Sequence, residues 1–296
     1  MKKKFRILSI FASLAGVSVL LQSTSVLFQV LDYIGGSEPP SPSPGTNLSP
    51  LPPTSGDAIK VASIATEFPT DWEEFATANS LNISTKQSEW LNRERDEDPD
   101  MYLKWMTSHG AVPVDSVRHQ IVLRGNRAEP VRITGMRVLS RCQRPLAGTY
   151  FLKPSGGGGE DTVRIGFNLD KSHPIAQRAD DLSASFGESY FASKTYSLKY
   201  KEEVVFQAIA ITSKFYCEYR IQIDALSGDR RIRQIIDNKG RPFNVTASIA
   251  RRGDTHPYKG YRTMYVGGLA RSEVTPKPGQ NDNRAWIQVD SKSWSG

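Results

Sequence analysis

The chain is poor in the residues from which catalytic and metal centres are built. Its 296 residues include 2 cysteines and 4 histidines. His109, His119, His173 and His256 pair with neither one another nor a Cys or acidic residue at a metal-ligand spacing. The Gly-x-Ser-x-Gly and Ser-x-x-Lys signatures of serine hydrolases are also absent. We therefore expect no metal, no cofactor and no enzymatic activity.

Two further features have ordinary explanations. The run Gly156–Gly159 lacks the Lys-Ser/Thr of a phosphate loop, so a loop tip is expected there. The acidic run from Asp96 to Asp100 does not have calcium-loop spacing and contains Pro99. Solvated acids that cap a helix are the better interpretation of this run.

Only one long apolar run occurs, from residue 7 to residue 31. Its length of about 25 residues is sufficient to cross a hydrocarbon core of roughly 30 Å. Residues 1–6 contain three Lys and one Arg, whereas Asp32 and Glu38 follow the run. Positive charge stays with the cytoplasm, so we expect a stub at 1–6, a single transmembrane helix at 7–31 and the rest of the chain outside.

The same residues also fit a cleaved signal peptide. Residues 2–6 would be its basic region, 7–21 its apolar region, and Ser23-Thr24-Ser25 a small-residue cleavage site. The apolar sequence that continues after Ser25 favours the uncleaved anchor. Both interpretations place the following domain outside the cytoplasm, either on the cell membrane or secreted.

A linker rich in Pro and Ser follows at 32–57. Residues 35–57 hold 7 of the 18 prolines. A segment of this composition has little to bury and tends to polyproline II, which makes a semi-rigid spacer. Residues 58–296 then remain for the exported part.

The segment 58–110 carries helical signals. Thr70-Asp71-Trp72-Glu73 has capping-box spacing, which predicts a helix start there. Asp98 before Pro99, and Gly110 after the last periodic residue, predict a second helix over Pro99–Ser108. We expect 58–110 to be an acidic helical segment that packs on the domain.

From residue 111 to 249 the apolar period becomes two. Alternation is clearest at 117–124, 163–170 and 215–224, and residues 204–211 are apolar on both faces, as in an inner strand. The phase slips beside Gly135, which predicts a bulge, and 237–240 reads as a turn. The pattern predicts a mainly β fold: an antiparallel, immunoglobulin-like β-sandwich with short N-terminal helices.

The two cysteines are predicted to form a disulfide that pins the two sheets together. Cys217 lies on the apolar face of its strand, and Cys142 ends a strand in phase with Met136 and Val138. Secreted domains favour such bridges. Two free buried thiols are the alternative.

The C-terminal part is basic. Residues 226–296 hold 13 Lys and Arg against 6 Asp and Glu. We expect 250–296 to be a loop-rich extension, and a patch for an anionic partner is predicted at Arg230, Arg231, Arg233, Arg251 and Arg252. Outside a membrane such a partner is an envelope polymer, lipid headgroups or an acidic protein surface, and no nucleic acid is expected. A solvated surface with no partner is the alternative.

The stretches RHQIVLRGNRAEPVRITGMRVL, CQRPLAGTYF, VRIGFNLD and IIDNKGRPF resemble a group of uncharacterised actinobacterial single-pass membrane proteins. The resemblance covers most of residues 100–247. It implies a membrane anchor and an exported β-rich domain, and it implies no activity.

The expected function is that of a membrane-anchored binding or scaffolding module outside the cytoplasm. Two alternatives remain. One is an accessory subunit of a membrane complex, held through residues 7–31. The other is an envelope hydrolase without a recognisable motif, which requires a concave pocket lined by convergent polar groups.

Overall fold

The computed structural model describes residues 51–67, 72–154, 163–179, 186–251, 253–267 and 286–294. The predicted stub, the membrane segment, most of the linker and the glycine run lie outside these residues. Within the described ranges no helix has both the length and the apolar character needed to cross a membrane. Residues from Pro50 onward form one compact unit.

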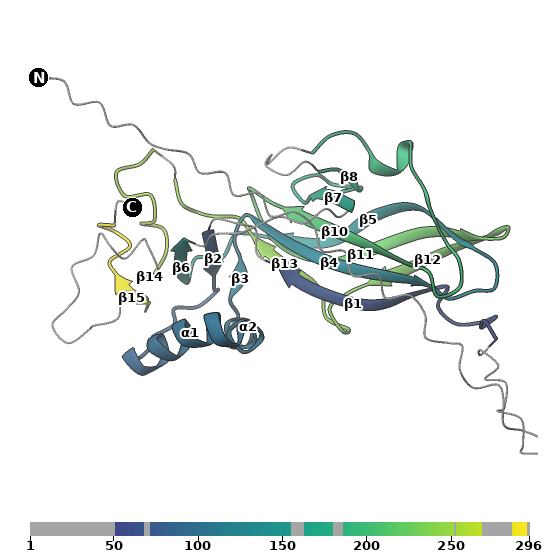
Figure 1. Cartoon of the computed structure of the whole chain (residues 1–296). Coiled ribbons are helices and arrows are strands. Elements are labelled where there is room, and N and C mark those ends of the chain that lie inside the picture. The colour runs from purple at the N-terminus through teal and green to yellow at the C-terminus, as the bar shows by residue number, and fades with distance from the viewer. Residues whose placement is uncertain are drawn as a thin grey trace, which may run out of the picture. The chain divides into compact units, whose positions relative to one another are not determined.

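Strands dominate this unit, as the sequence predicts, and they form three sheets (Figure 1). The first sheet has the order β1-β4-β10-β7-β8. Its strands are β1 (Ile59–Glu67), β4 (Ser116–Gly125), β10 (Glu203–Ile211), β7 (Val163–Asn168) and β8 (Gln177–Arg178). The second sheet has the order β12-β11-β5-β9, with β13 also paired to β11. Its strands are β12 (Arg230–Ile236), β11 (Tyr216–Ser227), β5 (Val131–Gln143), β9 (Tyr196–Leu198) and β13 (Phe243–Thr246).

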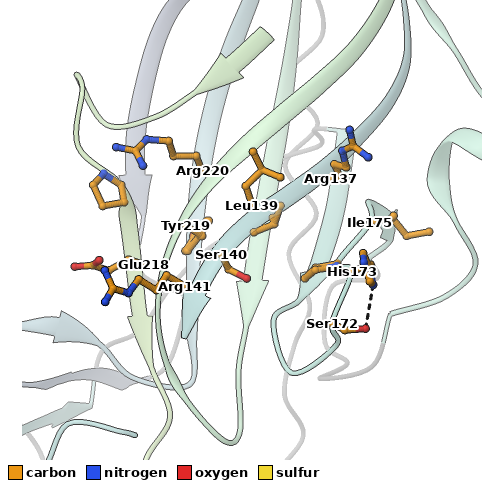
Figure 2. Close-up of a pocket in the computed structure, with 13 residues that line it drawn as sticks. Arg137, Leu139, Ser140, Arg141, Ser172, His173, Ile175, Glu218, Tyr219 and Arg220 are labelled. Atoms are coloured by element: carbon orange, nitrogen blue, oxygen red, sulfur yellow. Dashed lines mark hydrogen bonds between the residues drawn. The ribbon is translucent and has the colours of Figure 1, made fainter. Parts of the chain in front are cut away.

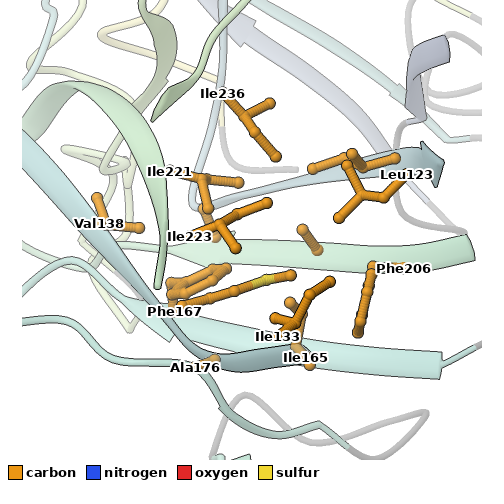
Figure 3. Close-up of a cluster of buried hydrophobic side chains, with 14 of the residues drawn as sticks. Leu123, Ile133, Val138, Ile165, Phe167, Ala176, Phe206, Ile221, Ile223 and Ile236 are labelled. Atoms are coloured by element: carbon orange, nitrogen blue, oxygen red, sulfur yellow. The ribbon is translucent and has the colours of Figure 1, made fainter. Parts of the chain in front are cut away.

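The first and second sheets share one apolar core (Figure 3). Each strand presents alternate side chains to it, because successive residues of a strand point to opposite faces. Leu123 and Phe206 come from the first sheet, and Ile133 and Ile223 from the second. All four are fully buried. Burying side chains of this size contributes about 1.5–3 kcal/mol each.

The antiparallel part of the prediction is incomplete. β10 pairs antiparallel with β4 but parallel with β7, and Phe206 lies opposite Val163 in that parallel register. The period of two is the same in both kinds of pairing, so strand direction is not encoded in it. The inner position predicted for residues 204–211 is confirmed, because β10 lies between β4 and β7.

Two predicted irregularities are confirmed in the second sheet. The register of β5 against β11 shifts where Gly135 lies opposite Asp224 and Ile133 lies opposite Ala225, which leaves Thr134 as the extra residue of a bulge. The turn at 237–240 links β12 to β13, and Gly240 there has a φ of +87°. β12 and β13 follow the same edge of β11, one after the other.

The third sheet has the order β15-β14-β6-β2-β3 and gathers short strands from distant parts of the chain. They are β2 (Trp72–Ala76), β3 (Val112–Pro113), β6 (Thr149–Pro154), β14 (Thr263–Val266) and β15 (Ile287–Val289). Two helices, α1 (Thr85–Glu97) and α2 (Pro99–Ser108), pack on one face (Figure 1). Phe75 and Phe151 join the helical residues Leu91 and Met106 in that cluster.

The predicted helix start at residue 70 is wrong, because Trp72–Ala76 is a strand. β2 lies between β6 and β3, with Phe75 buried on the helix side and Ala76 buried on the other. A strand buried on both faces loses the period of two, and pairing to both neighbours outweighs a local capping signal. The predicted helix Pro99–Ser108 is confirmed, and the Asp98 side chain accepts a hydrogen bond from Met101 N at 3.0 Å.

The two ends of the domain are also more regular than expected. The segment expected to be helical contains β1, which pairs with β4 along its length. The segment 250–296, expected to be a loop-rich extension, supplies β14 to the interior of the third sheet. Tyr265 and Trp286 from this segment complete the cluster beneath α1 and α2.

Candidate functional site

The predicted arginine patch does not form one surface. On β12, Arg231 and Arg233 lie opposite Leu226 and Asp224 of β11, on the face that points away from the core. Arg230 is on the other face of β12, since neighbouring residues of a strand alternate. Arg251 follows β13, whose Thr246 pairs with Tyr216 at the opposite end of β11 from Arg230. Arg252 lies outside the described residues.

The outer face of the second sheet instead gathers arginines from three strands. The register places Arg132 of β5 beside Leu226, whose other neighbour is Arg231. It also places Arg137 beside Gln222, and Arg141 beside Glu218. Residues opposite one another on neighbouring strands share a face. We call the set the arginine face; it consists of Arg132, Arg137, Arg141, Arg220, Arg231 and Arg233.

The bulge in β5 is what brings its arginines to one face. Arg132 and Arg137 are an odd number of residues apart, so a regular strand would put them on opposite faces. The extra residue, Thr134, restores the phase, and both side chains then point away from the core. A prediction that combined the Gly135 bulge with the spacing of these arginines would have placed Arg132, Arg137 and Arg141 on one face of β5.

Acidic side chains neutralise only part of this face. Asp224 lies 3.5 Å from Arg233 and 4.0 Å from Arg137, and Asp237 lies 3.3 Å from Arg220. Arg132, Arg141 and Arg231 form no ion pair within the described part of the chain. Because exposed ion pairs are weak, the pairs with Asp224 and Asp237 contribute little to stability. The guanidinium groups of Arg132, Arg141 and Arg231 are the ones available to a partner.

Exposed apolar side chains accompany the arginines. Leu139 of β5 is 47% exposed and Ile235 of β12 is 44% exposed, and both lie on the arginine face. Ile175 lies opposite Arg137, along the edge of β5 that faces away from β11, and it is 46% exposed. Arginine combined with exposed apolar side chains is typical of interaction surfaces.

A groove of about 660 Å³ borders this face (Figure 2). It is lined by residues 137–141 of β5, by 172–175, by 218–220 of β11 and by Pro242. Figure 2 shows Ser172 and His173 on one side of the groove and Arg141 with Glu218 on the other. The groove therefore combines guanidinium groups, an imidazole and apolar side chains.

The groove offers little for catalysis. Among the described residues, the His173 ring bonds through Nδ1 to the hydroxyl of Ser172, its neighbour in sequence, at 3.1 Å. No described carboxylate orients this imidazole, as a nucleophile–base pair requires. No group of three His, Cys, Asp or Glu side chains with metal-site geometry occurs among the described residues. The absence of enzymatic activity stays a prediction.

His119 is a buried core residue. It is 3% exposed, and its Nε2 lies 2.7 Å from the Tyr219 hydroxyl while Nδ1 lies 3.1 Å from Thr66 Oγ1. Burial lowers the pKa of His119 to about 3, so the ring is neutral at physiological pH. A neutral ring held on both nitrogens inside the core has a structural role.

The disulfide Cys142–Cys217 is confirmed, but its predicted position between the two sheets is wrong. The two residues are direct partners in the antiparallel pair of β5 and β11, with their Cα atoms 4.1 Å apart. The bridge therefore lies within the second sheet, beside the groove. An apolar position on a strand does not reveal which neighbour faces it, so the sequence did not distinguish these arrangements.

The comparisons with known proteins add no identity to this geometry. No family model, no curated protein and no solved structure matches the chain.

Proposed function

We propose that this protein is a membrane-anchored binding or scaffolding module, and that the arginine face and its groove bind an anionic partner outside the cytoplasm. The observation that carries the proposal is the gathering of six guanidinium groups from β5, β11 and β12 on one exposed sheet face. Guanidinium groups hold carboxylates and phosphates through paired hydrogen bonds. Leu139 and Ile235 add apolar contact between them.

The proposed location is the cell membrane, with residues 1–6 inside and the domain outside; secretion after cleavage is the alternative. The apolar run at 7–31 and its basic flank support this topology. The disulfide supports it as well, because such bridges persist in oxidising compartments. Protease treatment of intact cells or spheroplasts tests it. A protected tag at Gly296 together with a cleaved tag at Met1 would refute the topology.

The binding test uses the three arginines of this face that form no ion pair with any described residue. Arg132, Arg141 and Arg231 are changed together to Gln, which leaves no acidic side chain without its ion-pair partner. The matched control changes Arg230, Arg251 and Lys104 to Gln, with the same loss of charge on other exposed surfaces.

Retention of the full chain on envelope material is then measured against salt concentration. Wild type and control should elute together, and the triple variant should bind about tenfold more weakly, since exposed charge contacts contribute about 0.2–1 kcal/mol each. Equal loss in both variants would show that net charge alone matters, which contradicts the proposal. Retention that survives high salt but needs residues 7–31 would instead support a subunit held by its transmembrane helix.

A further inference from the structure

Beside the groove, one edge of β5 is left open. Cys142 and Cys217 form a close antiparallel pair, with Cα atoms 4.1 Å apart. In such a pair the two residues do not exchange backbone hydrogen bonds, so the N–H and C=O of Cys142 point away from β11. Ser140 and Val138 have the same orientation, because backbone direction alternates along a strand. Val138 confirms this, since its N–H donates to Pro174 O at 2.8 Å, on the side away from β11.

Pro174 is the residue at which this edge opens. The segment around Ile175 pairs antiparallel with β5, and Ala176 N donates to Met136 O at 2.9 Å. Pro174 accepts from Val138 but has no N–H to return to the Val138 carbonyl. Beyond it, the chain bends away through His173, and the β5 ladder on this side stops.

Two exposed residues of β5 therefore keep their edge groups unpaired. The N–H and C=O of Ser140 and of Cys142 have no backbone partner on this side within the described part of the chain. Edges of this kind are usually covered or blocked, because they template pairing with another chain. Here the groove, and no segment of the described residues, lies beside the open edge.

We propose that the open edge at Ser140 and Cys142 receives an extended acidic segment of a partner polypeptide as an added strand. This rests on the proposed function and names the partner class and the mode of binding. Strand addition gives affinity through backbone hydrogen bonds, while side-chain positions give specificity. An added strand lies about 4.8 Å from its neighbour, which places it over the groove between β5 and Ser172–His173.

Charge selects the acidic partner. Residues of the added strand opposite Leu139 and Arg141 point to the arginine face, two positions apart. The first meets an exposed apolar side chain, and the second meets a guanidinium group that has no ion-pair partner among the described residues. The partner segment therefore carries an apolar residue and an acidic residue at i and i+2.

A second copy of this chain is disfavoured by the same charges. Antiparallel self-pairing that matches Ser140 with Ser140 puts Arg141 diagonal to Arg141 of the other copy. Matching Ser140 with Cys142 puts the two Arg141 side chains directly opposite. Like charges at such positions destabilise strand pairing.

The test selects displayed random peptides of about 10 residues on the full chain and measures their affinity for two variants. Ser140→Pro removes the N–H that faces the open edge and leaves the bonds to β11, which come from the residues on either side. Ser140→Ala keeps that N–H and is the matched control. Retention of the disulfide and an unchanged melting temperature show that both variants fold.

Selected peptides should carry the apolar and acidic pair, bind Ser140→Ala as they bind wild type, and bind Ser140→Pro about tenfold more weakly. In the complex, the amides of Ser140 and Cys142 should exchange with solvent at least about tenfold more slowly, while those of Leu139 and Arg141, already bonded to β11, change little. Equal binding to both variants, or no enriched peptide, overturns the strand-addition proposal. Self-association that Ser140→Pro abolishes overturns the acidic partner.

The outcome is separable from that of the proposed function. Salt-sensitive retention that requires Arg132 and Arg231, combined with indifference to Ser140→Pro, keeps the anionic partner and rejects strand addition. Unchanged retention in the variant of Arg132, Arg141 and Arg231, combined with peptides that need the Ser140 N–H, keeps strand addition and rejects the arginine face as the surface that retains the chain on envelope material.

Discussion

Nε2 of His119 and the hydroxyl of Tyr219 meet at 2.7 Å in the core, joining β4 of the first sheet to β11 of the second. Both side chains are almost fully buried. Removing the hydroxyl in Tyr219→Phe leaves a ring nitrogen of His119 without its partner. We expect a loss of about 1–3 kcal/mol in the free energy of unfolding, measured by urea denaturation at pH 7.

The same histidine makes stability depend on pH. Burial lowers the pKa of His119 from 6.5 to about 3, so between these values the unfolded chain binds a proton that the native chain does not. Stability should therefore fall as pH falls through this window, by up to about 1.4 kcal/mol per pH unit, and this residue should contribute no slope above it. Urea denaturation from neutral to acidic pH measures the slope. His119→Gln should reduce it, and an unchanged slope would contradict the assignment.

The disulfide should contribute strongly to stability although it joins strands that already pair. It closes a loop with a sequence separation of 75. Constraining a loop of this length destabilises the unfolded chain by about 4–5 kcal/mol in the chain-entropy model. Urea denaturation of wild type and of the double variant Cys142→Ala, Cys217→Ala gives the difference. Two freely alkylated cysteines in the purified, unreduced protein would contradict the bridge.

Two glycines whose side-chain positions face away from the shared core should respond differently to Ala. A Cβ at Gly166 of β7 would overlap the ring of Phe186, which packs on the outer face of the first sheet. A Cβ at Gly135 would lie 3.7 Å from the nearest atom, Asp224 Cβ. Gly166→Ala should cost about 1–3 kcal/mol through overpacking, and Gly135→Ala should be close to neutral. Thermal melts of both variants provide the comparison.

Arg127 should control how firmly the linker joins the domain. Its buried guanidinium donates to the carbonyl oxygens of Gly56 and Asp57, and Asn126 Nδ2 also donates to Asp57 O at 2.7 Å. In Arg127→Ala the chain before Ala58 loses the bonds from the guanidinium to Gly56 O and Asp57 O, and limited proteolysis should cut there sooner. Arg124→Ala, on the exposed β4 surface, is the control and should leave the cleavage rate unchanged.

Sequence periodicity predicted β4 and β11, which face one core, and missed β2, which is buried on both faces. β4 and β11 alternate regularly because one side of each points into the shared core. Phe75 and Ala76 of β2 are buried on opposite faces, so no alternation exists to be read. The partners of β2 come from residues 112–113 and 149–154, and such distant pairing leaves no local pattern.

The candidate site was predicted in part for a similar reason. Arg231 and Arg233 stood out because they cluster in sequence, and both belong to the arginine face. Arg132, Arg141 and Arg220 are spread over two other strands and become neighbours only through the register of β5 with β11. Charge density along the chain does not report proximity across strands.

The parallel pairing of β6 with β14 sets the order in which the domain can be completed. Tyr150 lies opposite Met264, and Phe151 lies opposite Tyr265 in the same register. Until residue 266 has been synthesised, β6 lacks one neighbour and the apolar faces of α1 and α2 lack the Tyr265 side chain; the Trp286 side chain comes only 20 residues later. The apolar cluster around α1 and α2 can therefore be completed only after the last strands have been synthesised. Long-range pairing of this kind is slow, and apolar surface that is exposed in the meantime is open to binding by chaperones.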